Sequence, residues 1–314
     1  MDNAYDLVII GGGPAGLTAG LYAARARMKA LLLEKALCGG QAMLTDMIEN
    51  FPGFPEGVAG HELSARLEEQ AKRFGLAVEQ AESLGLERAQ GGAFSVALSG
   101  GRKVDALSVI VASGARWNSL GIPGEKELAG RGVSYCATCD GPLFRGKNVV
   151  VVGGGDTAVE DALFLTKFAA KVTIVHRRDR LRAAKILQER AFANKKIDVC
   201  LDSVAVRIEG ADRVSAVAIK NVKTGAETSL ECSGAFILIG LSPNTEFMKG
   251  LLRLDEKGYI ITDDDMKTSV DGIFACGDVR KKSLRQVVTA SGDGATAAAA
   301  AGHYVDRIRG CEYK

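Results

Sequence analysis

Two copies of a glycine-rich turn constrain the fold of this chain more than any other feature. The first copy, Gly11–Gly16, follows the apolar run 7–10, and the second, Gly153–Ala158, follows the apolar run 149–152. In both copies a pattern typical of a helix comes next. A buried strand, a G-x-G-x-x-G/A turn and a helix begin a dinucleotide-binding unit. The duplication therefore predicts two such units in the 314 residues, a length that fits two domains.

Three glycines of the first copy have predicted roles. Gly11 makes the tight turn, Gly13 lets a pyrophosphate approach the backbone, and Gly16 lets the helix pack on the strand. The helix N-terminus offers free N–H groups and a partial positive charge to the phosphates. The predicted phosphate-binding residues of this copy are Gly11, Gly13, Pro14, Ala15 and Gly16.

The residues after the second strand of each copy differ in charge. Glu34 lies 23 positions after Gly11, where a carboxylate can accept hydrogen bonds from a ribose hydroxyl. The same 23 positions after Gly153 lead to His176, which is followed by two arginines. Arginines suit a ribose 2′-phosphate, so the first site fits FAD or NAD and the second fits NADP. The second predicted site comprises Gly153, Gly155, Asp156, Thr157, Ala158, His176, Arg177, Arg178 and Arg182.

Composition excludes several other functions. The alternative interpretation of the arginine run is a solvated helix start or a nucleic-acid patch, and the coincidence of the run with the ribose position argues against both. A formal net charge of +2 gives no case for nucleic acid or a membrane surface as the main partner. No apolar run reaches the ~18 residues of a membrane span. The chain also enters its first predicted strand without a basic, apolar leader. We therefore expect a cytoplasmic protein whose main partner is neither nucleic acid nor membrane.

Two of the seven cysteines have a spacing that carries chemistry. Cys136 and Cys139 form a Cys-x-x-Cys pair, with Asp140 directly behind the second sulfur. Such a pair at a helix start favours the thiolate. Half a zinc site is the alternative, but no second Cys or His pair stands at metal-ligand spacing, and we predict no metal site. We expect the remaining cysteines to be buried, inert thiols, namely Cys38, Cys200, Cys232, Cys276 and Cys311.

Further stretches extend the pattern along the whole chain. They are GGGPAG (11–16), GGQ (39–41), CATCDG (136–141), GGGDTA (153–158), HRRDRLRA (176–183), ACGDV (275–279) and LRQVVTASGDGA (284–295). With them the chain resembles the bacterial low-molecular-weight thioredoxin reductases. The resemblance implies an α/β fold with two Rossmann-like, three-layer ββα-type domains. Residues 1–116 and 245–314 would form a discontinuous FAD-binding domain, and residues 117–244 an inserted NADPH-binding domain that carries the cysteine pair.

The resemblance also assigns roles to single residues. Contacts to FAD are implied for Glu34, Lys35, Gly40, Gln41, Asn50, Gly277, Asp278, Val279, Arg285, Gln286 and Val287. NADPH would reduce FAD, FAD would reduce the Cys136–Cys139 disulfide, and the dithiol would reduce thioredoxin. Cys139 would face the flavin, Cys136 would attack thioredoxin, and Asp140 would protonate the leaving thiolate. A homodimer is implied as well.

Two other kinds of protein share parts of this pattern. A flavoprotein that serves a peroxiredoxin through a fused carrier domain has a similar core, but an additional N-terminal domain. A non-catalytic redox-sensing module would have little need of two nucleotide sites.

Overall fold

The structure, a computed structural model, describes residues 5–45, 47–89, 92–248 and 250–311. The segment before Tyr5, on which the expectation of a missing leader rests in part, lies outside these residues. The chain divides into two compact units, Met1–Arg116 with Ser242–Lys314, and Trp117–Leu241. Within the described ranges, no helix combines the length and the apolar character that crossing a membrane requires.

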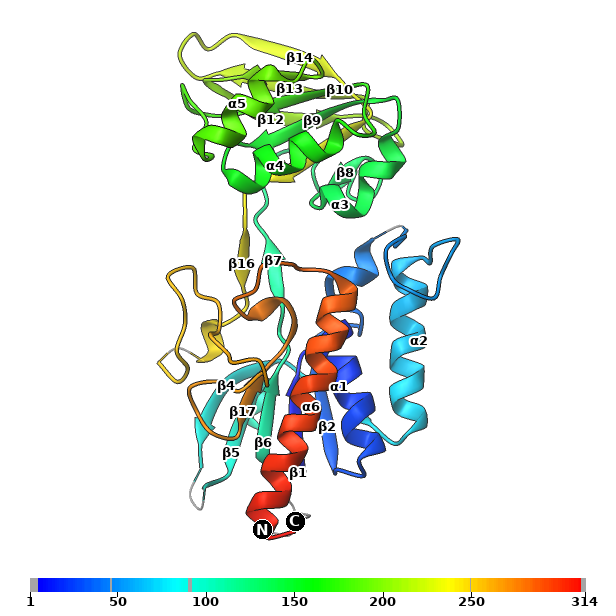
Figure 1. Cartoon of the computed structure of the whole chain (residues 1–314), viewed down its shortest axis with the longest axis vertical. Helices are drawn as coiled ribbons and strands as arrows, with labels where there is room; N and C mark the ends of the chain where they lie inside the picture. The colour runs from blue at the N-terminus through cyan, green and yellow to red at the C-terminus, as the bar shows by residue number, and fades with distance from the viewer. Residues whose placement is uncertain (1–4, 46, 90–91, 249, 312–314) are drawn as a thin grey trace. The chain divides into compact units, whose positions relative to one another are not determined.

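A largely parallel sheet forms the centre of the first unit (Figure 1). Its strands are β1 (Tyr5–Ile10), β2 (Ala30–Glu34), β3 (Ala77–Gln80), β4 (Ser83–Arg88), β5 (Phe94–Leu98), β6 (Lys103–Val111) and β17 (Ile273–Ala275). The order is β3-β2-β1-β6-β5-β4, with β17 also paired to β6. Strands β3, β2, β1, β6 and β17 are parallel, whereas β4 and β5 add an antiparallel meander.

Three helices cover one face of this sheet, and they are α1 (Pro14–Arg25), α2 (Gly60–Arg73) and α6 (Val287–Arg309). Figure 1 shows α1 beside both α2 and α6. Strand β1 is buried on both faces, because Leu7 and Ile9 pack toward the helices while Val8 and Ile10 pack into a second core. Short 3-10 turns are η1 (Gly40–Leu44), η3 (Ser99–Gly101), η5 (Glu246–Met248) and η6 (Gly277–Val279).

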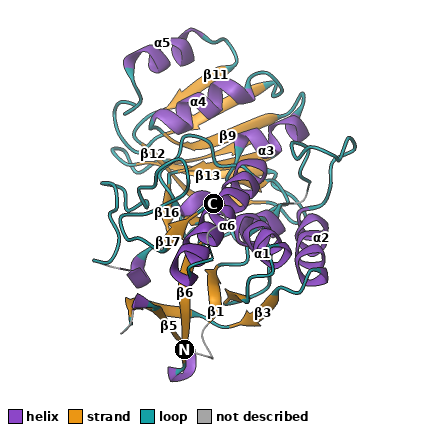
Figure 2. Cartoon of the chain, turned by 60° about the horizontal axis from the view of Figure 1, so that its bottom comes forward, coloured by secondary structure: helices purple, strands orange, loops and turns teal. Residues whose placement is uncertain are grey.

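The second unit repeats this plan (Figure 2). Its parallel sheet has the order β11-β10-β9-β15-β8, and a separate antiparallel sheet has the order β12-β13-β14. The strands are β8 (Val133–Ser134), β9 (Asn148–Gly153), β10 (Lys171–Val175), β11 (Ile197–Cys200), β12 (Ser203–Glu209), β13 (Ala216–Asn221), β14 (Glu227–Glu231) and β15 (Gly234–Leu238). The helices are α3 (Ala137–Asp140), α4 (Asp156–Leu165) and α5 (Lys185–Ala193), with the 3-10 turn η4 (Gly141–Phe144).

Strand β9 separates two cores in this unit. Val149 and Val151 pack with α4, whereas Val150 and Val152 pack toward the β12–β14 sheet. Helices, parallel sheet and antiparallel sheet therefore form three layers. The predicted α/β fold with two Rossmann-like domains is confirmed.

Two short strands lie where the chain passes between the units. Strands β7 (Ala115–Trp117) and β16 (Leu241–Pro243) pair with each other where the chain passes between the units. The Asn118 amide also donates to the Gly240 carbonyl at 3.0 Å. This pairing was not predicted, because it joins segments more than a hundred positions apart.

Two helix starts differ from the sequence prediction. Helix α1 begins at Pro14 and not at Leu17, because proline fits the first helical position, where its missing N–H is not needed. Helix α4 begins at Asp156 and not at Val159. The two helices therefore begin immediately after Gly13 and Gly155. Their free N–H groups lie at the predicted nucleotide sites.

Candidate active site

The first glycine turn has one open face. Gly11 has φ +110°, and a Cβ there would lie 2.4 Å from the Ala112 carbonyl oxygen. A Cβ on Gly16 would lie 1.9 Å from the Gly11 carbonyl oxygen. In contrast, a Cβ on Gly13 would meet no described protein atom within 4 Å. Gly11 and Gly16 are thus required by the fold, whereas Gly13 leaves room for a ligand beside the N-terminus of α1.

Glu34 is oriented toward this turn from the end of β2. Its carboxylate accepts hydrogen bonds from the amides of Gly12 at 2.7 Å and Ala36 at 3.1 Å. A carboxylate has about four acceptor positions, so further hydrogen bonds to ribose hydroxyls remain possible. A cavity of about 370 Å³ lies beside Glu34, and Cys38 and His61 contribute to its lining. The arrangement fits an adenosine with a free 2′-hydroxyl.

The GGQ stretch also reaches this turn. Gly40 has φ +55°, and a Cβ on it would lie 3.2 Å from the Cα of Gly13. Gly13 and Gly40, which are both predicted to contact the nucleotide, therefore lie next to each other. Gln41 follows in η1 with an exposed side chain, and Lys35 is exposed after β2.

A buried acceptor marks the other end of the predicted first site. The Oδ1 atom of Asp278 is buried and has no hydrogen-bond partner among the described residues. Burial raises the pKa of this carboxyl, and the charges of Lys282 and Arg285 partly oppose the shift. An unpaired buried polar atom is costly, and a ligand hydroxyl would remove the cost. Val279 ends the same short turn, η6.

Residues 285–287 lie at the start of α6. The Arg285 guanidinium stacks 4.3 Å above the centre of the Tyr259 ring, and its Nε has no acceptor in the described part of the chain. Asn50 donates to the Gln286 side chain at 2.9 Å, which joins two predicted contacts that are far apart in sequence. Val287 is the first residue of the helix.

The second glycine turn repeats the open face. A Cβ on Gly153 would lie 2.6 Å from the Ala158 Cβ, whereas a Cβ on Gly155 would meet no described atom within 4 Å. Asp156 and Thr157 are both exposed at the start of α4. The Asp156 carboxylate accepts a hydrogen bond from the Ala184 amide at 2.7 Å and so fixes the loop after the arginines.

The arginine run surrounds this turn. His176 is 5% exposed, and its ring occupies the space that a Cβ on Gly154 would need. Burial lowers the pKa of His176, a backbone hydrogen bond at Gly153 partly opposes the shift, and the neighbouring arginines lower the pKa further, so the neutral ring predominates at pH 7. Its Nε2 has no partner among the residues described. The Arg182 amide donates to the Gly154 carbonyl at 2.7 Å, which places this arginine beside the turn.

The side chains of Arg177, Arg178 and Arg182 are exposed. Over the described ranges, none of the three forms an ion pair with a carboxylate of the chain. A cluster of uncompensated guanidinium groups next to a glycine turn attracts a phosphorylated ligand. The residues predicted for the second site therefore lie together.

Cys136 and Cys139 form a disulfide in the second unit. Cys136 caps the N-terminus of α3, and the Cys139 amide donates to its sulfur at 3.2 Å. An amide N–H directed at sulfur stabilises a thiolate after reduction. Asp140 ends α3 and is half-buried. The disulfide leaves neither sulfur as the thiolate that a zinc site needs, and the described residues contain no group of side chains suited to a metal ion.

A buried carboxylate supports the segment before Cys136. Glu125 is 1% exposed and accepts hydrogen bonds from the Leu120 amide at 3.0 Å and the Gly121 amide at 2.7 Å. It also accepts from the Tyr135 hydroxyl at 3.0 Å, and the Tyr135 ring stacks with Trp117. No local sequence signal indicates this contact, because charge pattern alone does not show that Glu125 is buried.

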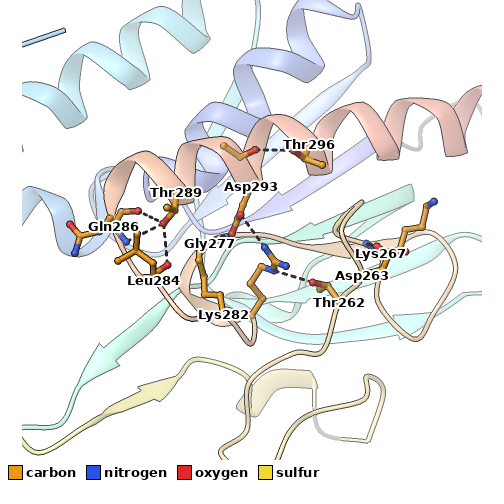
Figure 3. A network of polar contacts seen from close by, with 12 residues as sticks. Thr262, Asp263, Lys267, Gly277, Lys282, Leu284, Gln286, Thr289, Asp293 and Thr296 are labelled. Carbon is orange, nitrogen blue, oxygen red and sulfur yellow. Dashed lines mark hydrogen bonds and ion pairs between the residues drawn. The ribbon is translucent and has the colours of Figure 1, made fainter. Parts of the chain in front are cut away.

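A second carboxylate, the partly buried Asp293 on α6, was also missed (Figure 3). It accepts hydrogen bonds from the Gly277 amide at 3.1 Å and from Lys282 at 2.8 Å. Its position in the small-residue part of the helix was the only indication, since a helix of alanines and glycines brings polar side chains close to neighbouring backbone.

The remaining cysteines are not all buried, contrary to the prediction. Cys232 and Cys276 are buried and Cys38 and Cys200 half-buried, but Cys311 is exposed after the end of α6. Burial raises the pKa of Cys232 to about 11 and, together with Glu68 and Glu34, that of Cys38 to about 11. Burial also raises the pKa of Cys200 and Cys276.

These shifts predict a labelling order. Only the thiolate reacts with iodoacetamide, and a raised pKa means that thiolate forms only at higher pH. At about pH 8 we expect rapid labelling of Cys311 in the oxidised protein, and of Cys136 in addition after mild reduction. Cys38 and Cys232 should react appreciably only as the pH approaches about 11. Peptide mapping of the labelled protein checks this order, and rapid labelling of Cys232 at about pH 8 would contradict it.

Comparison with known proteins adds to this geometry. The sequence profile of a family described as pyridine nucleotide-disulphide oxidoreductase matches residues 5–294. A curated relative from Bacillus subtilis, named thioredoxin reductase, is 48% identical over 309 residues, which are 98% of this chain and 97% of the relative. A relative from Peptoclostridium acidaminophilum with the same name is 49% identical over 312 residues, which are 98% of this chain and 98% of the relative. The crystal structure of thioredoxin reductase from Streptococcus pyogenes superimposes with a TM-score of 0.93 at 48% identity, and covers 98% of this chain and 100% of its own.

Proposed function

The chain belongs to the pyridine nucleotide-disulphide oxidoreductase family, and from this premise we propose that it is a thioredoxin reductase that uses FAD and NADPH. The observation that carries the proposal is the Cys136–Cys139 disulfide, which lies in the same unit as the arginine-lined glycine turn. Relatives named thioredoxin reductase match over nearly the whole length of both chains.

We assign FAD to the first unit. The open face at Gly13, the Glu34 carboxylate and the unpartnered Asp278 Oδ1 fit a pyrophosphate, a ribose and a further hydroxyl of such a ligand. Bound flavin supplies the ability to accept a hydride from a nicotinamide and to deliver two electrons to a disulfide. The protein's own part is to bind this group and to fix its orientation.

We assign NADPH to the second unit. Gly155 leaves room for the pyrophosphate, and Arg177, Arg178 and Arg182 supply positive charge for the 2′-phosphate. A neutral His176 adds a hydrogen-bonding nitrogen that no described group uses. An acidic residue at this position would repel the phosphate, so the arginines favour NADPH over NADH.

The dithiol then transfers electrons by disulfide exchange. The Cys136 thiolate attacks one sulfur of the thioredoxin disulfide, a mixed disulfide forms, and the other thioredoxin sulfur leaves as a thiolate that takes a proton. Cys139 next attacks the Cys136 sulfur, which releases the second thioredoxin thiol and restores the Cys136–Cys139 disulfide. Two electrons and two protons pass to thioredoxin in total. Asp140, adjacent to Cys139, is our candidate for the proton donor.

Thioredoxin as the partner, assembly as a homodimer and location in the cytoplasm belong to the proposal. Their support is the relatives' name and the resemblance of the motifs. A turnover assay tests the function directly. The purified chain should oxidise NADPH in the presence of thioredoxin disulfide and release thioredoxin thiols in a one-to-two ratio. A redox-sensing module would show no turnover.

The open face at Gly13 gives a prediction about flavin. A Gly13→Val side chain would enter the space proposed for the pyrophosphate, and overpacking of this kind weakens binding on the order of 10- to 100-fold. The fold should survive, since a Cβ added to Gly13 would meet no described atom within 4 Å and its φ of −72° is ordinary. Flavin content and circular dichroism of the purified protein measure both effects.

Gly16→Ala is the matched control, because its Cβ would collide with the Gly11 carbonyl oxygen at 1.9 Å. This variant should lose stability and flavin together. If Gly13→Val retains flavin at the parent level, the pyrophosphate binds elsewhere.

A further inference from the structure

A partly buried ionic cluster holds the turn that carries Asp278. Asp293 lies in the second turn of α6, and its Oδ2 accepts hydrogen bonds from the Gly277 amide at 3.1 Å and from Lys282 Nζ at 2.8 Å. Its Oδ1 accepts from the Arg280 guanidinium at 3.0 Å. Figure 3 shows Asp293 directed from the helix toward Gly277 and Lys282. One carboxylate therefore joins α6 to both sides of the Asp278 position.

The cluster is unusual in charge as well as in burial. The side chains of Asp293, Arg280 and Lys282 are only 12%, 13% and 9% exposed. Two cations share one carboxylate, so the group carries a net positive charge. Lys282 acts electrostatically on Asp278 and stabilises its ionised form. Without Asp293, two largely buried cations would lose this counterion, which is unfavourable.

The residues around the ionic cluster pack against the start of α1, next to the first glycine turn. Gly277 has φ +74°, and a Cβ on it would lie 2.8 Å from the Ala15 Cβ. Gly294, next to Asp293, is closer still to α1, because a Cβ on it would lie 2.2 Å from the Ala15 carbonyl oxygen. The Gly277 turn and α6 thus both contact the first turn of α1, where the phosphates are proposed to bind.

We propose that Asp293 is a positioning residue for the flavin site, which acts by fixing the Gly277–Asp278 turn so that the Asp278 carboxylate meets the ligand. The fixed turn holds the unpartnered Oδ1 of Asp278 in position to accept a hydrogen bond from the ligand. Asp293 itself is satisfied by the three donors named above and has no need of the ligand. The inference rests on the proposed assignment of FAD to this unit.

A double-mutant cycle on the full-length holoenzyme tests the inference. Its members are the parent, Asp293→Asn, Asp278→Ala and the double variant. FAD release on dilution, followed by the fluorescence of free flavin, gives the dissociation constant of each. Asp293→Asn should raise this constant about 10- to 100-fold, the effect expected for one charge-assisted hydrogen bond. In the Asp278→Ala background, the same substitution should change it by less than about 3-fold, because the effect is transmitted through Asp278.

Asp271→Asn is the matched control, since Asp271 also pairs with an arginine, Arg307 of α6, but its side chain is 71% exposed. It should leave FAD binding within about 2-fold of the parent. If Asp293→Asn does not fold, Asp293→Asn/Lys282→Met takes its place in the cycle, because it removes one cation together with the carboxylate.

The outcomes separate the inference from the proposed function. Additive effects of Asp293→Asn and Asp278→Ala would mean that Asp293 only supports the fold, and would overturn the inference alone. FAD affinity unchanged in Asp293→Asn would do the same. A parent protein that binds no FAD would overturn the proposed function and this inference with it.

Discussion

Replacing Cys136 by serine should lower thioredoxin-reducing turnover on the order of 10⁴-fold or more, the scale of loss when a catalytic nucleophile is removed. Cys139→Ser should lose turnover to a similar degree, because neither variant can form the internal disulfide. Both should retain the parent's flavin content, since the two cysteines belong to the second unit and the proposed flavin site to the first. Turnover with NADPH and thioredoxin, measured beside the flavin spectrum, checks both expectations.

The two cysteine variants should differ from each other in reactivity. The Cys136 sulfur accepts a hydrogen bond from the Cys139 amide at the start of α3, so Cys136 should be the better nucleophile. Cys139→Ser should therefore trap thioredoxin as a mixed disulfide through Cys136, and Cys136→Ser should trap little. The exposed Cys311 provides the control, because Cys311→Ser should keep full turnover. Trapping through Cys139 instead would reverse the two roles but keep the reaction.

Replacing Arg177 and Arg178 together by alanine should weaken NADPH binding roughly 10²- to 10⁴-fold, because two charge-assisted contacts to the 2′-phosphate are lost. The exposure of both side chains favours the lower end of this range. NADH, which lacks the 2′-phosphate, should bind as it does to the parent. Michaelis constants for both nucleotides at one salt concentration measure the difference.

Arg180→Ala is the matched control for this pair. Arg180 lies in the same loop and is also exposed, but it is outside the predicted site. Its loss should change NADPH binding little. Equal weakening in Arg180→Ala would point to a general charge effect, and equal loss of NADH and NADPH in the double variant would mean that the arginines support the fold.

The parts of the fold that local sequence patterns determine were predictable. A glycine turn between an apolar strand and a helix can be recognised because backbone contacts, such as that of Gly16 with the Gly11 carbonyl, exclude any side chain. The repeated spacing from Gly11 to Glu34 and from Gly153 to His176 distinguishes the two predicted nucleotides, because it aligns an acid in one copy with a basic run in the other.

Contacts made only on folding were not predictable. Glu125 and Tyr135 meet because a turn brings the loop back to the cysteine segment. Asp293 meets Gly277, Arg280 and Lys282 because α6 packs against the 277 turn. Glu125 belongs to none of the motifs, and the 284–295 stretch contains Asp293 but does not show which groups its carboxylate binds. The exposure of Cys311 was missed for the same reason, since a residue type indicates only an average burial.

Anaerobic titration of the purified protein with NADPH tests the central claim, that electrons from NADPH reach the Cys136–Cys139 disulfide. Flavin absorbance and protein thiols are followed together, and the new thiols are located by alkylation and peptide mapping. We expect two new thiols per chain, at Cys136 and Cys139, as the first equivalent of NADPH is consumed. Bleaching of the flavin without new thiols at these two positions would contradict the account.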